Sequence, residues 1–337
     1  MHKTFIIAEA GINHNGNIGK AMQLVKIAKL AGADAVKFQL FDMYEQLSTF
    51  AKVPSFQKKR VGNISMMNMA KSYYLPWSAH IKIKKYCNKL KIQYLASCFD
   101  DASINFYVKI LKTKTIKIGS GEITNFSLLK KSTELCNRVI LSTGMSTTKE
   151  ITNALKILKK NKKTKINLLH CISDYPTKNE NLNLKCILTL KNKFKLDTGF
   201  SDHSLGFEGA MISLGLGAKI IEKHFTINKK LKGPDHSMSL DPNELKTYIS
   251  KVRAAEKILG NGIKLPNKNE IKLKKLVRRS IFSNRKIKKG EKITKFNTCV
   301  KRPIVGIPSE KINSILGKLL KKDINKNEPI FINYIKQ

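Results

Sequence analysis

Short apolar runs rich in β-branched residues alternate with longer segments of helical periodicity through the first three quarters of the chain. The apolar runs predict eight strands, at residues 4–9, 34–39, 92–97, 115–119, 138–142, 166–171, 197–201 and 219–224. The intervening segments predict helices at 18–31, 77–90, 102–112, 125–136, 149–161, 181–192 and 207–217, followed by a last helix at 242–258. In the first helix, Ile18, Met22, Val25 and Ala28 recur at helical spacing, and Gly32 marks the stop.

This alternation of strand and helix predicts the fold class. Eight strand-then-helix units within about 260 residues favour a (β/α)8 barrel, the TIM-barrel architecture. A doubly wound parallel sheet is the weaker alternative, because eight regular units exceed its usual strand count. In addition, no G-x-G-x-x-G motif follows the first predicted strand.

Polar side chains stand at the C-terminal end of every predicted strand, which is where (β/α)8 barrels carry their chemistry. Side chains two residues apart on a strand face the same way, so several of these residues form same-face pairs. One such residue taken alone is more often a surface lysine, a capping serine or a hydrogen-bonded core histidine. Polar groups at all eight ends instead indicate a site at the barrel mouth. They are Glu9, Lys37 with Gln39, Ser97, Lys117, Ser142, His170, Ser201 with His203, and Glu222 with His224.

The C-terminal part of the chain differs from the first part in composition and in its pattern of apolar residues. Residues 259–275 are polar and contain Gly, Pro and Asn, which predicts a linker between a barrel at 1–258 and a module at 276–337. The module shows short alternating β-like runs and a weak repeat, in which 286–293 (KIKKGEKI) matches 323–330 (DINKNEPI). Gly290 and Asn327, which tolerate positive φ, occupy the turn each time. Two hairpin-like units predict a compact pseudo-symmetric β module that is small enough to need docking against something larger.

Charge and composition limit the classes of partner. The 337 residues carry 64 Lys and Arg against 24 Asp and Glu, a net charge of +40 that could suit nucleic acid. However, only seven of the basic residues are arginine, the residue that reads bases and phosphates bidentately, so solvated lysine faces are favoured. No apolar run reaches the length of a membrane span, and the first residues resemble no signal peptide. Six cysteines without framework spacing predict reduced thiols in a cytoplasmic protein.

A series of motifs, in order along the chain, resembles the sialic acid (N-acetylneuraminate) synthase family. They are 8–17 (AEAGINHNGN), 36–39 (VKFQ), 117–122 (KIGSGE), 141–145 (LSTGM), 168–171 (LLHC), 175–177 (YPT), 201–203 (SDH), 222–225 (EKHF) and 233–235 (GPD). Residues 280–329, with 300–303 (VKRP), resemble the antifreeze-like SAF (β-clip) module of the same family. The resemblance implies a (β/α)8 barrel followed by a small β-rich SAF domain. It also implies a transferase that condenses phosphoenolpyruvate with an N-acylated mannose-type sugar to form a nine-carbon 2-keto acid and phosphate.

The resemblance also implies a role for each matched residue. Lys37, Ser97, Lys117, Ser120, Ser142 and Ser201 match positions that hold the phosphate and carboxylate of phosphoenolpyruvate. His203 and His224 match the ligands of Mn²⁺, Mg²⁺ or a similar divalent ion. Polar positions around the two substrates are matched by Glu9, Gln39, Glu122, Ser173, Tyr175 and Asp235. Arg302 matches an arginine that reaches into the barrel of another protomer, which implies a domain-swapped homodimer. At 96–99 this chain has ASCF where the family usually has Ser-Thr-Pro-Phe.

The choice of sugar and two other functions stay open at this point. Residues 122–125 (EITN), 173–174 (SD), 233–237 (GPDHS) and 277–280 (VRRS) resemble the legionaminic acid synthase branch, which uses 2,4-diacetamido-2,4,6-trideoxymannose. N-acetylmannosamine is the alternative sugar. A 3-deoxy-heptulosonate-type synthase would share the barrel and phosphoenolpyruvate but would not require an SAF module. A non-catalytic carbohydrate-binding protein would not need lysines and histidines at the barrel mouth.

Overall fold

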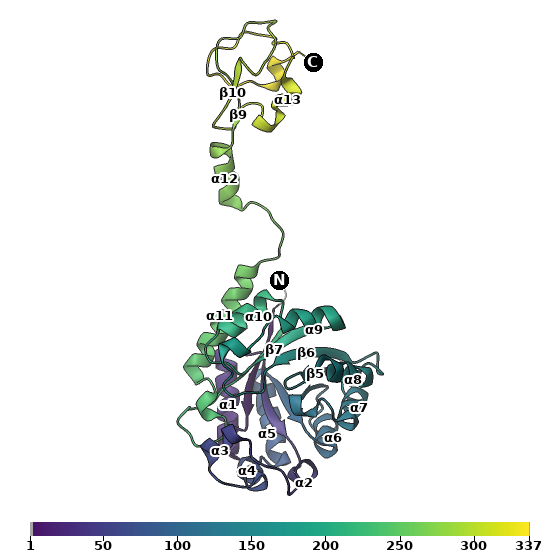
Figure 1. Ribbon diagram of the computed structural model, residues 1–337. Helices are drawn as coiled ribbons and strands as arrows, with labels where there is room; N and C mark the ends of the chain where they lie inside the picture. The colour runs from purple at the N-terminus through teal and green to yellow at the C-terminus, as the bar shows by residue number, and fades with distance from the viewer. Residues whose placement is uncertain (1–2, 337) are drawn as a thin grey trace. The chain divides into compact units, whose positions relative to one another are not determined.

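The computed structural model describes residues 3–336 in two compact units, one ending at Asn261 and the other beginning at Gly262 (Figure 1). Within the described residues, no helix is both long and apolar enough to cross a membrane. The six cysteines all fall in this part of the chain and are free thiols.

The first unit is a closed barrel of eight parallel strands, so the predicted (β/α)8 fold is confirmed. Each strand pairs with the next along the chain, and β8 pairs with β1 to close the barrel. Every predicted strand is present, with its ends shifted by at most two residues. The strands are β1 (Phe5–Gly11), β2 (Ala35–Leu40), β3 (Gln93–Cys98), β4 (Thr115–Ile118), β5 (Arg138–Ser142), β6 (Lys165–Cys171), β7 (Asp197–Asp202) and β8 (Ile220–His224).

The helices that follow these strands match the predicted ones closely. The first ends as predicted at Gly32, which has a φ of 89°, and begins where the Asn17 side chain accepts a hydrogen bond from the backbone of Lys20. The eight predicted helices are α1 (Ile18–Ala31), α5 (Trp77–Leu90), α6 (Asp101–Lys109), α7 (Phe126–Leu135), α8 (Thr148–Leu158), α9 (Cys186–Phe194), α10 (Glu208–Gly215) and α11 (Pro242–Leu259).

Shorter elements between strands and helices were not predicted, because four to eight residues are too few for a clear helical period. Between β2 and α5 lie α2 (Met43–Gln46), α3 (Ser55–Val61) and α4 (Met66–Tyr73). A 3₁₀ turn, η2 (Asn179–Asn181), stands where the start of α9 was expected, and α9 itself begins at Cys186. Two further 3₁₀ turns follow strands of the barrel, η1 (Ser120–Glu122) after β4 and η3 (His236–Met238) after β8.

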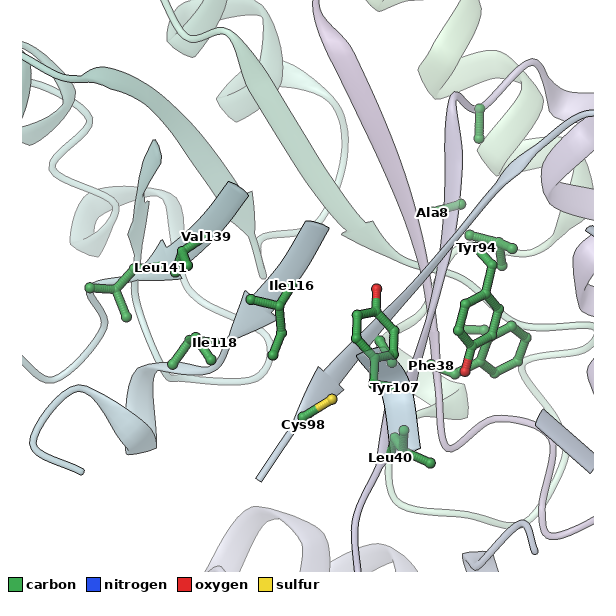
Figure 2. Packing of buried hydrophobic residues seen from close by; sticks show 14 of the residues in the cluster. Ala8, Phe38, Leu40, Tyr94, Cys98, Tyr107, Ile116, Ile118, Val139 and Leu141 are labelled. Carbon is green, nitrogen blue, oxygen red and sulfur yellow. The ribbon is translucent and has the colours of Figure 1, made fainter. Parts of the chain in front are cut away.

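Two apolar layers hold the barrel together, one on each face of its sheet. Outward-facing side chains such as Phe38 and Leu40 of β2, Ile116 and Ile118 of β4, and Leu141 of β5 are buried in the core cluster that includes residues of the surrounding helices (Figure 2). Inward-facing side chains form a separate, smaller cluster, consisting of Ile7, Ala35, Leu95, Ile140, Leu169 and Ile220. The barrel is therefore closed by a packed apolar layer inside, as in other barrels of this architecture.

The second unit is a small β-rich module with its own core of buried isoleucines and Leu320. Its elements are α12 (Lys268–Val277), the antiparallel strands β9 (Ser280–Ser283) and β10 (Thr298–Lys301), η4 (Ser309–Lys311), α13 (Ile312–Ile315) and η5 (Ile332–Tyr334). The two sequence repeats lie side by side, because Ile287 and Ile324 exchange two backbone hydrogen bonds of 2.9 Å. Gly290 and Asn327 adopt φ values of 80° and 67° at the equivalent turns, which confirms the predicted repeat.

Most of α12 lies in the segment predicted as a linker, 259–275. This helix begins with a capping box, in which Asn267 accepts from the backbone of Glu270 and the Glu270 side chain accepts from the backbone of Asn267. The polar composition of 259–275 concealed this helix, because most of its residues are polar and none of them is buried.

Candidate active site

A cavity of about 340 Å³ is lined by the C-terminal ends of the barrel strands and the loops that follow them. Thirteen of the residues to which the family resemblance assigns a role line it. They are Glu9, Lys37, Gln39, Ser97, Lys117, Ser120, Ser142, Ser173, Tyr175, Ser201, His203, His224 and Asp235. The cavity is also lined by Pro54, Gln57, Phe99, Gly119, Gly121, Met145, Cys171 and Glu222.

Strand alternation explains why so many polar residues converge here. The inward-facing apolar layer contains Ile7, Ala35, Leu95, Ile140, Leu169 and Ile220. Two residues further along the same strands, on the same face, stand Glu9, Lys37, Ser97, Ser142, Cys171 and Glu222. The sequence thus builds an apolar floor and, one layer above it, a polar ring that lines the cavity.

The centre of the ring is a buried cluster of two lysines and two glutamates. Lys37 Nζ lies 2.9 Å from Glu9 Oε1 and 3.8 Å from Glu222 Oε2, and it donates a 2.9 Å hydrogen bond to Ser97 Oγ. Lys117 Nζ lies 3.6 Å from Glu222 Oε1, which also accepts a 2.9 Å hydrogen bond from Ser201 Oγ. All four charged side chains are at most 6% exposed, so their charges are hardly screened by solvent.

The two carboxyl groups of this cluster, Glu9 and Glu222, have pKa values shifted in opposite directions. Burial raises the pKa of Glu9 to about 7, although Lys37 acts against this rise. Burial also acts to raise the pKa of Glu222, but the ammonium groups of Lys117 and Lys37 lower it to about 2. Glu222 is therefore the carboxylate that stays ionised between the two lysines.

Four polar atoms of the cavity wall have no hydrogen-bond partner in the protein. They are Glu9 Oε2, Ser142 Oγ, Glu222 Oε2 and His224 Nδ1, out of eight such buried side-chain atoms among the described residues. Because buried polar groups are nearly always satisfied, this concentration indicates that the wall is built to bind a polar ligand.

Gly144 opens a small cradle on one side of the cavity. A Cβ added there would lie 2.4 Å from Ser173 Oγ and 2.8 Å from Ser120 Oγ, so only glycine fits without a shift. The Gly144 amide donates a 2.9 Å hydrogen bond to Ser120 Oγ. The cradle thus sets the Ser120 and Ser173 hydroxyl groups beside each other on the wall.

The two histidines predicted as metal ligands lie together, with ring centroids 5.6 Å apart. His203 Nδ1 is 2.7 Å from the Ile172 carbonyl oxygen, which can only accept, so Nδ1 carries a proton and Nε2 is the nitrogen with the lone pair when the ring is neutral. Burial acts to lower the pKa of His203, but Cys171 and the Ile172 carbonyl raise it. Burial and His203 hold the pKa of His224 well below its usual value, so this imidazole is neutral.

These observations fit a divalent ion bound at an open site. His224 Nδ1 has no hydrogen-bond partner, and the bond from His203 Nδ1 to the Ile172 carbonyl fixes the tautomer of that ring. Imidazole nitrogens held in this way are ligands that such an ion prefers. Among residues 3–336, no set of three or more His, Cys, Asp or Glu side chains is placed to hold a metal. An ion here would therefore take two protein ligands and complete its shell from substrate or water.

Three residues expected at the site do not line the cavity. His170 of β6 lies between Leu169 and Cys171, which face inward, so its side chain is on the other face of the sheet, where Nε2 lies 2.7 Å from the Leu182 carbonyl oxygen. Glu122 lies in η1, and its carboxylate accepts a 2.9 Å hydrogen bond from Asn125 Nδ2. Arg302 belongs to the second unit, directly after β10, and is exposed there. The roles implied for Glu122 and Arg302 stay predictions.

Sequence reasoning missed other residues of the site. Glu222 was noted at a strand end but given no role, although it shares a strand face with His224 two residues later. Arg60 and Gln57 come from α3, and no pattern in the sequence pointed to them. Arg60 Nη1 donates to the Pro234 carbonyl at 2.7 Å and Nη2 to the Tyr175 carbonyl at 3.2 Å.

Comparison with known proteins agrees with this geometry. Residues 24–264 match the NeuB family, and residues 278–333 match the SAF domain. The chain is 42% identical to an N,N'-diacetyllegionaminic acid synthase of Campylobacter jejuni, over 98% of this chain and 99% of that protein. It is 38% identical to a protein of the same name from Legionella pneumophila, over 98% and 94%. A crystal structure of N-acetylneuraminic acid (sialic acid) synthetase from Leptospira borgpetersenii in complex with citrate is also similar, with a TM-score of 0.70 and 34% identity over 80% of this chain and 90% of that one.

The matches cover the barrel, the cavity and the C-terminal module, in the order in which the sequence motifs occur. The family match spans well over half of the chain, and the relatives align along almost their whole length. The chain therefore belongs to the NeuB family and carries a C-terminal SAF domain.

Proposed function

We propose that this protein is a nonulosonic acid synthase that condenses phosphoenolpyruvate with 2,4-diacetamido-2,4,6-trideoxymannose. The products would be phosphate and a nine-carbon 2-keto acid of the legionaminic type. The observation that carries the proposal is the buried Lys37–Lys117 pair, set beside two histidines and four unsatisfied polar atoms in one cavity. The choice of sugar is supported by the similarity to two N,N'-diacetyllegionaminic acid synthases.

The cationic half of the cavity suits phosphoenolpyruvate. This substrate carries a phosphate and a carboxylate on three carbons, so it needs positive charge and hydroxyl donors close together. Lys37 and Lys117 supply the charge, and Ser97, Ser142 and Ser201 supply hydroxyl groups from β3, β5 and β7. The surrounding protein excludes most of the water, which strengthens these interactions.

In the proposed reaction, C3 of phosphoenolpyruvate attacks the aldehyde carbon of the open-chain sugar. Water then adds to C2, and the tetrahedral intermediate loses phosphate through cleavage of the C–O bond. Preorganised positive charge at Lys37 and Lys117 stabilises the negative charge on the leaving phosphate. Glu222, held ionised between them, supplies negative charge where C2 becomes cationic.

His203 and His224 would hold the divalent ion, Mn²⁺ or Mg²⁺. Such an ion supplies Lewis acidity that polarises the aldehyde oxygen. The hydrogen bond to the Ile172 carbonyl fixes the ring of His203 in the orientation that presents Nε2.

The second unit is proposed to act in a domain-swapped homodimer. Arg302 would contact the acyl or hydroxyl oxygens of the sugar in the partner's barrel, which its planar fork suits better than a lysine would. The free thiols favour the cytoplasm as the compartment.

The test is phosphate release from phosphoenolpyruvate in the presence of Mn²⁺ and one sugar at a time. We expect release with the diacetamido sugar, less with N-acetylmannosamine, and none with erythrose 4-phosphate, the substrate type of a 3-deoxy-heptulosonate synthase. Excess chelator should abolish release, and His203→Ala should lose Mn²⁺ binding measured by electron paramagnetic resonance. Full activity in chelator would remove the metal from the proposal, and release only with erythrose 4-phosphate would replace the function.

A further inference from the structure

Another part of the cavity wall differs in chemistry from the part that carries the lysines. It includes Gln57, Tyr175 and Asp235, which offer an amide, a phenol and a carboxyl group. Such groups suit the hydroxyl and amide groups of a sugar better than the anionic groups of phosphoenolpyruvate. These three residues come from α3, the loop after β6 and the loop after β8, so their arrangement depends on what joins these segments.

Arg60 contacts both loops from α3. Its two terminal nitrogens donate to the carbonyl groups of Pro234 and Tyr175, at 2.7 Å and 3.2 Å. Pro234 directly precedes Asp235, and the Tyr175 ring lies 4.0 Å from the ring of His203, centroid to centroid. A single guanidinium group thus spans the two loops and connects both to α3.

The other contacts of the loop after β8 hold its outer parts, apart from a hydrogen bond between the side chains of Gln57 and Asp235, which adds a second link between α3 and this loop. Asn15 Nδ2 donates to the Lys232 carbonyl at 2.9 Å, and His236 lies within hydrogen-bond distance of both Asn15 and Thr226. Ser239 Oγ donates to the Asp235 carbonyl at 2.6 Å. Each of these three contacts, made by Asn15, His236 and Ser239, joins the loop to itself, to the loop after β1 or to the end of β8.

We propose that Arg60 is a positioning residue for the sugar: it sets the distance between Tyr175 and Asp235 and holds α3 over this half of the cavity. The inference rests on the proposed function and deepens it, because it assigns the acceptor-sugar side of the site to a bridge that no sequence motif contains. Lysine cannot replace Arg60, since a single ammonium group lacks the planar fork that holds two carbonyl groups at once.

The experiment compares Arg60→Ala, Arg60→Lys and Lys58→Ala. Lys58 lies on the same helix and is exposed, so its loss removes a positive charge from α3 without touching either loop. We expect Arg60→Ala to lower kcat/KM for the sugar by about 10- to 100-fold, because small misplacements of binding groups have effects of that size. The KM for phosphoenolpyruvate and the unfolding midpoint should stay at wild-type values. Lys58→Ala should behave as wild type, and Arg60→Lys should fall close to Arg60→Ala.

Hydrogen exchange gives a readout that does not depend on substrate. Arg60→Ala should speed amide exchange in 173–177 and 232–236 relative to Lys58→Ala. Unchanged exchange, equal effects on both substrates, or full rescue by Arg60→Lys would each overturn the bridging role. If the wild-type protein releases no phosphate with either sugar, the proposed function fails and the inference falls with it. If wild type is active and Arg60→Ala matches Lys58→Ala, only the inference fails.

Discussion

A buried ion pair behind the active site offers a sharp test of how the barrel holds its catalytic strands. Asp202 of β7 and Lys223 of β8 are direct register partners, and their charged atoms lie 3.0 Å apart. The two side chains are 0% and 2% exposed, respectively. Each stands between cavity-lining neighbours along its strand, so the pair lies on the opposite face of the sheet from the cavity.

Asp202 is also fully hydrogen-bonded. It accepts from the Ser204 backbone at 2.9 Å, from Ser204 Oγ at 2.6 Å and from the Tyr248 hydroxyl at 2.8 Å, while Lys223 also donates to the Ser204 carbonyl. Lys223→Met would leave a buried carboxylate without its counter-ion, which costs roughly 3–5 kcal/mol of unfolding free energy. For a domain of this size that corresponds to a fall in Tm of roughly 6–20 °C. Tyr248→Phe removes only one bond to a charged group and should cost about 1.5–3 kcal/mol.

The assay is reversible denaturation in urea, followed by circular dichroism, on the full chain. The matched control is Lys165→Met, which breaks a 3.3 Å pair with Asp197 across β6 and β7 whose side chains are 62% and 46% exposed. That variant should lose at most about 1 kcal/mol. The double variant Asp202→Asn with Lys223→Met should recover part of the loss, because no charge is then buried alone. If Lys223→Met costs no more than Lys165→Met, the buried pair is not what secures these two strands.

Three other predictions follow from the site and from the base of the barrel. Lys117→Ala should lower kcat/KM for phosphoenolpyruvate by roughly 10²–10³, whereas Lys160→Ala on the surface should leave it unchanged. Equal values for the two variants would mean that Lys117 does not bind phosphoenolpyruvate. Burial acts to raise the pKa of Asp34, but its hydrogen bonds to two basic side chains and a β1 amide lower it overall, so its stabilisation is present above the unfolded pKa and is lost as pH falls through the folded one. The stability gap between wild type and Asp34→Asn in denaturant should therefore be large at pH 7 and shrink in acid, and a gap independent of pH would contradict this. Mixing Arg302→Ala with His224→Ala protein should restore part of the activity lost by each, because a mixed domain-swapped dimer keeps one intact site; no rescue after subunit exchange would mean that Arg302 does not act across protomers.

Local sequence determined most of the barrel and most of its polar ring. Strand and helix positions depend on short-range periodicity, caps and glycine stops, such as Gly32, and these survive without any tertiary context. The same alternation places Lys37 two residues beyond Ala35 and Glu222 two residues beyond Ile220. The apolar floor and the polar ring above it therefore both follow from the order of residues along the strands. The internal repeat of the second unit was readable for a similar reason, since its turns need residues that accept positive φ.

Tertiary structure decided which of these groups meet and with what protonation. Glu9, Lys37 and Glu222 come from three strands, and they form one cluster only because β8 closes onto β1. Whether a carboxyl group is ionised depends on burial and on charges distant in sequence, so Glu9 and Glu222 could not be told apart beforehand.

The same limit explains the residues that were missed or misplaced. Arg60 joins two carbonyl groups that lie 115 and 174 residues away along the chain, and a backbone acceptor has no signature in the sequence. Glu122 follows a strand end, but the 3₁₀ turn η1 carries its carboxylate to Asn125 instead of into the cavity. Side-chain period is a local property of the backbone, whereas contact, distance and electrostatic environment are properties of the closed barrel, and the site depends on both.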